Sequence, residues 1–212
     1  MAEKMNWATA VKPLLKKYRG KKHPLEYNNL YELMVMVILA AQTSDKLINS
    51  VAPELFKAFP DMPSLARATP DTLYPKISKV IGFRKKGEWL IKTAQILKTN
   101  KKIPLTMDAL TKLPGIGRKS ANVIMLQAGV AAEGVIVDLH VVRVAPRLGI
   151  TKGSDPKQIE QDIMKKIPQK DWDVGMAISF LGREVCHNRN PEHDKCVMKD
   201  VCAYYKKINK VK

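Results

Sequence analysis

Apolar residues recur at helical spacing along almost the whole chain. Trp7, Val11 and Leu14 mark the apolar face of a first amphipathic helix that ends near Gly20. Residues 30–41 are apolar on almost all sides, which indicates a helix buried at the centre of the fold. Further helices are expected over 47–59, 89–97, 106–113, 118–128, 139–148 and 172–181.

Capping residues and prolines divide this helical chain. Thr69-Pro70 and Asp155-Pro156 each join a capping residue to a proline suited to the first helical position, so each predicts a helix start. Pro53 falls inside the 47–59 pattern, and we expect it to kink or restart that helix. A strand is plausible only at 135–137, which is too short to make a sheet. The predicted fold class is therefore all-α.

The composition points to a folded protein with a polyanionic partner. The 212 residues suit one large domain or two small ones, and 45% hydrophobic residues are enough for a core. Lysine and arginine total 37 against 20 acidic residues, a net charge of +17. Because such a chain repels itself, nucleic acid is the first partner to expect, ahead of an anionic membrane surface.

Several classes of protein are excluded by the same sequence. The three cysteines all follow residue 185 and cannot form a secreted disulfide framework. The longest apolar stretch, 33–41, is far shorter than the roughly 20 residues of a transmembrane helix. The first residues lack the apolar core of a signal peptide. We expect a soluble, cytoplasmic protein with no membrane association and no targeting extension.

Residues 113–121, Leu-Pro-Gly-Ile-Gly-Arg-Lys-Ser-Ala, are the most informative stretch. Gly115 and Gly117 let the backbone turn tightly and lie close to a ligand. The following helix presents unpaired N–H groups, which suit a phosphate. Arg118 and Lys119 place positive charge in its first turn, where acidic residues are normally favoured. Taken alone, the string also suits an ordinary connection between two helices with exposed basic residues.

The whole string matches the helix-hairpin-helix motif of DNA-repair glycosylases. The motifs at 39–45, 81–86 and 137–144, followed by the cysteines, occur in the order found in endonuclease III, and the chain resembles that family from about residue 5 to 207. The resemblance implies a six-helix domain at 24–132 and a second domain built from 1–23 and 133–212, with bent DNA in the cleft between them.

The resemblance also implies a catalytic pair. Lys119 stands where bifunctional members carry the nucleophile, whose neutral amine attacks the sugar C1′, expels the damaged base and leaves a Schiff base. Asp138, nineteen positions later, would deprotonate Lys119 or stabilise the oxocarbenium-like transition state. It is also a good N-cap for the helix from 139, and both roles are compatible. The linkage between the pair looks one position longer than in typical members, with 129–134 the expected insertion.

Extrusion of the target base requires residues that replace it in the DNA stack. By resemblance, Gln42 fills the void and Phe83 is the wedge beside the unpaired partner, although Phe83 also suits a packed turn. Arg84, Lys85 and Lys86 are expected to contact phosphates. The predicted DNA-binding residues are Gln42, Phe83, Arg84, Lys85, Gly115, Gly117, Arg118 and His140.

The C-terminal cysteines depart from the family pattern. Endonuclease III has the spacing C-x6-C-x2-C-x5-C around a four-iron–four-sulfur cluster, whereas Cys186, His193, Cys196 and Cys202 form C-x6-H-x2-C-x5-C. Three interpretations are open: a 4Fe-4S iron-sulfur cluster with one histidine ligand, a zinc site, or a metal-free remnant.

Together these features predict a bifunctional DNA glycosylase with AP-lyase activity. Its partner is double-stranded DNA containing damaged bases or abasic sites, bound by a monomer, and oxidised pyrimidines are the substrate class that the resemblance implies. The alternatives are a glycosylase for a different lesion, a monofunctional glycosylase, and a helix-hairpin-helix module that binds DNA without catalysis.

Overall fold

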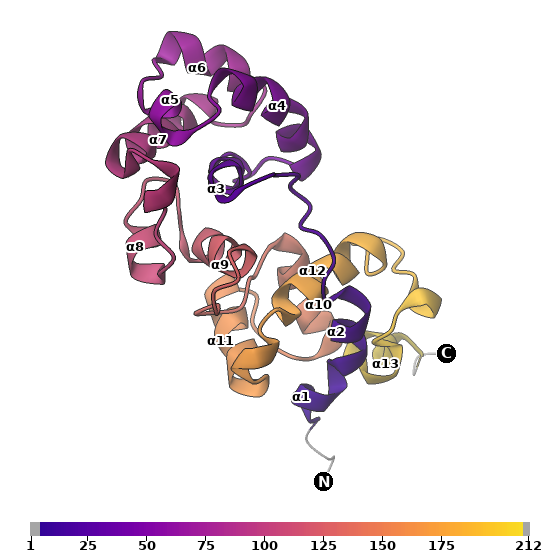
Figure 1. The fold of residues 1–212 in the computed structure, drawn as a ribbon. Coiled ribbons are helices and arrows are strands. Elements are labelled where there is room, and N and C mark those ends of the chain that lie inside the picture. Colours follow the sequence, from indigo (N-terminus) through magenta and orange to yellow (C-terminus); the bar gives the residue numbers. More distant parts are fainter. Residues whose placement is uncertain (1–4, 210–212) are drawn as a thin grey trace. The chain divides into compact units, whose positions relative to one another are not determined.

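The computed structural model describes residues 5–209, and the regular structure in that part of the chain is helical throughout (Figure 1). No strand forms between residues 5 and 209, and 135–137 is buried, irregular chain. The predicted all-α class is therefore confirmed.

The chain divides into two compact units. One consists of Lys22–Ala131, and the other combines Met1–Lys21 with Ala132–Lys212. The sequence placed these two boundaries one or two residues further along, after 23 and 132. Each unit has its own core, and the hairpin lies in the first unit whereas Asp138 and the cysteines lie in the second.

The unit at 22–131 is organised around one buried helix. In α3 (Leu30–Leu39) every residue from Tyr31 to Leu39 is buried, and its neighbours are α4, α7 and α9. Such burial explains why its sequence is apolar on nearly all sides. The elements around it are α4 (Asp45–Ala58), α5 (Met62–Ala66), α6 (Pro70–Ile77), α7 (Phe83–Leu97), the 3-10 turn η1 (Asn100–Lys102), α8 (Met107–Thr111) and α9 (Arg118–Gln127).

Pro53 does not restart its helix, and the kink that the sequence offered as the alternative stays a prediction. Helix α4 runs without interruption from Asp45 to Ala58, with Pro53 inside it. A proline there removes one backbone hydrogen bond and costs about 3 kcal/mol. Burial of the apolar face on both sides of the proline offsets that cost; its residues are Ile48, Val51, Ala52 and Leu55.

The second unit packs its C-terminal helices around one apolar core. Helix α12 (Val174–Glu184) packs against α10 (Leu139–Leu148) and α2 (Lys12–Tyr18). Gly175 allows this helix to lie against 135–136, because a Cβ there would be 2.4 Å from the Ile136 carbonyl oxygen. The remaining elements are α1 (Trp7–Ala10), α11 (Pro156–Lys166), η2 (Gln169–Asp171), η3 (His193–Lys195), η4 (Lys199–Val201) and α13 (Ala203–Asn209).

Both predicted cap-plus-proline starts are confirmed. Thr69 precedes α6, and its backbone N–H donates to Thr72 Oγ1 at 3.0 Å. The Asp155 carboxylate accepts from the backbone N–H of Gln158 at 3.0 Å at the start of α11. These local signals depend on neighbours in the sequence, which is why they could be read without the tertiary structure.

Candidate active site

The turn between α8 and α9 requires glycine at its first glycine position. Gly115 has φ +79°, a conformation that L side chains rarely adopt. A Cβ on Gly115 would also lie 2.8 Å from Cε3 of Trp89 and 3.2 Å from Cγ2 of Ile38. The internal packing of the unit is therefore sufficient to explain this glycine.

Gly117 differs, because nothing inside the protein requires it. It has the extended φ of −96°, and no heavy atom lies within 4 Å of where its Cβ would be. It is the N-cap of α9, and no side chain caps this end within the described chain. Arg118 and Lys119 follow as exposed residues of the first turn. The backbone here is open to close approach by an anionic ligand.

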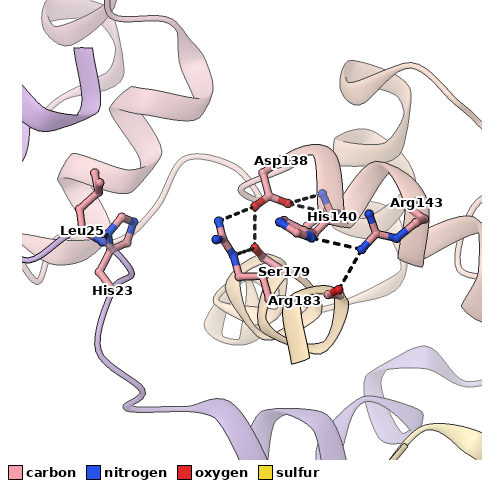
Figure 2. A network of polar contacts seen from close by, with 9 residues as sticks. His23, Leu25, Asp138, His140, Arg143, Ser179 and Arg183 are labelled. Atoms are coloured by element: carbon pink, nitrogen blue, oxygen red, sulfur yellow. Dashed lines mark hydrogen bonds and ion pairs between the residues drawn. The ribbon is translucent and has the colours of Figure 1, made fainter. Parts of the chain in front are cut away.

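The carboxylate of Asp138 is held at the start of α10, on the second unit (Figure 2). Its Oδ1 accepts from the backbone N–H groups of His140 and Val141, both at 2.9 Å. Its Oδ2 accepts from Ser179 Oγ at 2.6 Å and forms an ion pair with Arg183 Nη2 at 3.5 Å. The capping role expected for Asp138 is confirmed, and the carboxylate is oriented from two helices.

Ser179 and Arg183 were missed by reading the sequence. Both come from α12, and Ser179 is only 1% exposed within an otherwise apolar run. A buried hydroxyl requires a partner, so a serine inside an apolar helix was a signal that something polar lies opposite it. Which group that was depended on the packing of α12 against α10.

His140 is the second residue of α10, and its side chain contacts Arg143 (Figure 2). Its Nδ1 is 3.1 Å from Arg143 Nη2, and the same nitrogen of Arg143 donates to the Gly182 carbonyl at 2.8 Å. His140 is half-buried, and its contact with DNA stays a prediction.

The expectation that Lys86 contacts phosphate is wrong. Lys86 is 5% exposed, and its Nζ donates to the carbonyl oxygens of Leu39 at 2.7 Å and Ala41 at 2.5 Å. A third bond reaches Thr43 Oγ1 at 3.3 Å, and burial lowers the pKa of Lys86. The three acceptors surround Gln42, which is exposed and has the left-handed φ of +58°. Lys86 therefore holds the turn that carries the predicted void-filling residue.

Replacing Lys86 with methionine is expected to loosen this turn. The change leaves buried carbonyl oxygens without their donor, which costs about 1–3 kcal/mol. A chain of this size should then lose roughly 5 °C in Tm, measured by circular dichroism. Lys85→Met is the matched control, because Lys85 is exposed and forms an ion pair with Glu88 at the surface, at 3.6 Å. Equal Tm values for the two variants would contradict the assignment.

At the start of α7, the expected wedge residue Phe83 is less exposed than Ile81 in the loop before it. Phe83 is half-buried, with its ring edge-to-face on Tyr74 at 5.6 Å between centroids and the guanidinium of Arg84 at 5.7 Å from its centroid. Ile81, two residues earlier, is 57% exposed. Phe83 as a DNA wedge stays a prediction, and so do Arg84 and Lys85, both exposed, as phosphate contacts.

Cys186, His193, Cys196 and Cys202 all line one small pocket of the second unit. In residues 5–209, no three His, Cys, Asp or Glu side chains converge closely enough to ligate a single ion. Arg147 lies beside the site, with Nη1 donating to Cys186 Sγ at 3.4 Å. Burial raises the pKa of the Cys196 and Cys202 thiols. Thiol and imidazole side chains are ligands both of iron–sulfur clusters and of zinc.

Comparison with known proteins identifies the family of this chain. The family model "HhH-GPD superfamily base excision DNA repair protein" matches residues 35–169. Endonuclease III of Synechocystis sp. is 37% identical over 206 residues, which cover 95% of this chain and 94% of that protein. This chain belongs to the HhH-GPD superfamily. Endonuclease III of Escherichia coli (strain K12) is 28% identical over 211 residues, 97% of this chain and 100% of its own.

The likeness extends to solved structures of the same superfamily. A trapped endonuclease III–DNA covalent intermediate has a TM-score of 0.84 and 30% identity to this chain, covering 95% of it and 96% of its own chain. A non-covalent endonuclease III–DNA complex has the same TM-score and identity. The predicted resemblance is confirmed, and this HhH-GPD chain is a DNA-binding base-excision glycosylase and AP lyase. No helix within residues 5–209 is long and apolar enough to cross a membrane.

Proposed function

We propose that this HhH-GPD protein excises oxidised pyrimidines from duplex DNA and cleaves the strand at the resulting abasic site, with Lys119 as its nucleophile. The observation that carries the proposal is that Gly117 and Lys119 lie two positions apart at the start of α9. Gly117 leaves its backbone open to close approach, and Lys119 is exposed in the turn directly after it. A phosphate bound at the start of α9 would place the adjoining sugar beside the amine.

The chemistry assigned to Lys119 is covalent. Once its amine has lost a proton, Nζ attacks C1′ of the extruded nucleotide; the N–C1′ bond forms as the glycosidic bond breaks, and the base leaves with that electron pair and takes up a proton. Opening of the sugar ring gives a protonated Schiff base. Loss of a C2′ proton then expels the 3′ phosphate with the C3′–O electrons, and water hydrolyses the Schiff base to restore the lysine.

The remaining residues prepare that reaction. We assign Gln42 to the void, the 81–83 loop to separation of the bases, and Arg84, Lys85, Arg118 and His140 to the DNA strand. Asp138 is the carboxylate of the pair. The two compact units are proposed to act as the two domains of a monomer that works on DNA in the cytoplasm.

Cys186, His193, Cys196 and Cys202 are proposed to hold a four-iron–four-sulfur cluster. The spacing of the four residues supports this assignment, because it departs from the four-cysteine pattern of endonuclease III only by His193 in place of the second cysteine. When bound, the group would supply structural support to the C-terminal segment and take no part in bond breaking. Protein purified without oxygen is expected to contain about four iron and four sulfide per chain and to be brown. Zinc in a colourless protein would contradict the cluster.

The function is tested by borohydride trapping across a panel of duplexes. Each duplex carries one lesion: thymine glycol, another oxidised pyrimidine, 8-oxoguanine, a mismatch or an abasic site. We expect a covalent adduct and strand cleavage with the oxidised pyrimidines and the abasic site. Base release without an adduct would indicate a monofunctional enzyme. An adduct confined to 8-oxoguanine would indicate a different substrate class. DNA binding with neither base release nor an adduct would indicate a non-catalytic module.

A further inference from the structure

Two side chains of helix α12 contact the carboxylate of Asp138. Ser179 and Arg183 lie one turn apart on this helix, and both reach Asp138 Oδ2 (Figure 2). The Asp138 side chain is 11% exposed and that of Arg183 is 31% exposed. All three residues belong to the same compact unit, so this arrangement is internal to its core packing.

The direction of the hydrogen bonds is set by chemistry. Arg183 Nε lies 3.3 Å from Ser179 Oγ, and a guanidinium only donates. Ser179 must therefore accept from Arg183, which leaves its own hydroxyl proton for Asp138 Oδ2 at 2.6 Å. The Ser179 hydroxyl therefore bridges the two charged groups in one orientation: it accepts from Arg183 and donates to Asp138.

Close packing of α12 on α10 keeps this bridge short. A Cβ on Gly182 would lie 2.8 Å from the Cβ of His140, so only a glycine allows the two helices to approach this far. Ser179, at 1% exposure, has no room to turn toward solvent. A buried hydroxyl at such a contact is costly unless its hydrogen bonds are made, which favours the bonded orientation.

The carboxylate of Asp138 has few acceptor positions left. An ionised carboxylate offers about four lone-pair directions. Oδ1 accepts two backbone N–H groups, and Oδ2 contacts Ser179 and Arg183. A proton on Oδ2 would face the hydroxyl proton of Ser179 and the positive charge of Arg183. Lys119, by contrast, is exposed, so water can receive the proton that its ammonium loses.

We propose that Ser179 is a positioning residue that fixes Asp138 as an ionised carboxylate, so that Asp138 stabilises the positive charge developing on the sugar and does not accept the proton of Lys119. The proposal rests on the function proposed above. It separates the two roles that the sequence left open for Asp138. The two roles predict opposite results when the Ser179 hydroxyl is removed. If Asp138 acts as a fixed charge, the excision rate should fall. If Asp138 accepts the proton of Lys119, the rate should stay the same or rise, because one more lone pair of the carboxylate is open.

The first test is Ser179→Ala, measured as single-turnover excision and as DNA affinity. We expect the excision rate to fall about 10- to 100-fold, because a hydrogen bond to a charged group is lost, while the Kd for lesion DNA changes less than about twofold. Ser179→Thr, which keeps the hydroxyl, should restore most of the rate. Ser179→Cys has nearly the same shape and a weaker donor, and should be intermediate if alanine disturbs folding. An unchanged or increased rate in both the alanine and cysteine variants would overturn the proposal.

The second test is a double-mutant cycle with Asp138→Asn. If Ser179 acts through Asp138, its replacement by alanine should change the rate of the Asp138→Asn enzyme by less than about twofold. The same loss in both backgrounds would sink the proposal. Ser50→Ala is the control, because the Ser50 hydroxyl donates to the Leu47 carbonyl of its own helix at 2.8 Å. A wild-type chain that forms no adduct would refute the proposed function, whereas a normal wild type with an unaffected Ser179→Ala variant refutes the role of Ser179 alone.

Discussion

Replacing Lys119 with alanine is expected to abolish borohydride trapping and to lower base excision by about a thousandfold or more. Removal of an enzyme's nucleophile costs several orders of magnitude in rate, and about 1,000-fold corresponds to roughly 4 kcal/mol of transition-state stabilisation. DNA affinity should fall much less, because one charge among 37 basic residues is lost. Trapping gels and single-turnover excision on a thymine-glycol duplex measure both effects.

Lys157→Ala provides the matched control for this substitution. Lys157 is exposed and is the second residue of α11, as Lys119 is the second residue of α9. The control therefore removes the same charge from the same helical position without a hairpin beside it. We expect it to trap and excise like the wild type. An adduct that survives in the Lys119→Ala variant would assign the nucleophile to another amine.

Asp138→Asn is expected to lower the excision rate about 100- to 1,000-fold while leaving the fold intact. Asparagine is as good an N-cap as aspartate, so the backbone N–H groups of His140 and Val141 keep an acceptor. The negative charge is lost, and with it the acceptor that Oδ2 offers to Ser179 and Arg183. Removal of one preorganised electrostatic contact commonly costs this much in rate. Single-turnover kinetics and a thermal melt of the same sample separate chemistry from stability.

A cap elsewhere in the same unit shows what capping alone contributes. Asp155 caps α11 in the way that Asp138 caps α10. Asp155→Ala should cost about 0.5–2 kcal/mol of stability and leave excision unchanged. If Asp138→Asn excised at the wild-type rate, Asp138 would be only a cap, and the carboxylate would have no part in the reaction.

Much of the secondary structure followed from the sequence because its signals are local. The spacing of apolar residues located α3, α9 and α10, and Thr69 and Asp155 marked helix starts through contacts with residues three positions away. The sequence did not show that α4 continues through Pro53, because the burial that keeps it continuous comes from other helices. Propensity is a local preference that tertiary packing can outweigh.

The candidate site also combines residues that local motifs indicate with residues whose partners are distant in the sequence. Short contiguous motifs predicted the turn at Gly115 and Gly117 and the cap at Asp138. The catalytic roles of Lys119 and Asp138 come from the family resemblance and stay predictions. Lys86 was misread as a surface charge, since its acceptors lie more than forty positions earlier in the chain. Ser179 was missed for the same reason, because it meets Asp138 across 41 positions.

The sequence by itself indicated an all-helical chain with a polyanionic partner, a glycine hairpin with a lysine after it, and an aspartate at a later helix start. Those features are carried by composition, periodicity and contiguous motifs, which are properties of the chain before it folds. Only the tertiary structure decided that Lys86 supports the Gln42 turn, that Ser179 and Arg183 hold Asp138, and that the four C-terminal donors share one cavity. Each of these depends on segments brought together by core packing, and no local preference specifies which buried polar groups meet there.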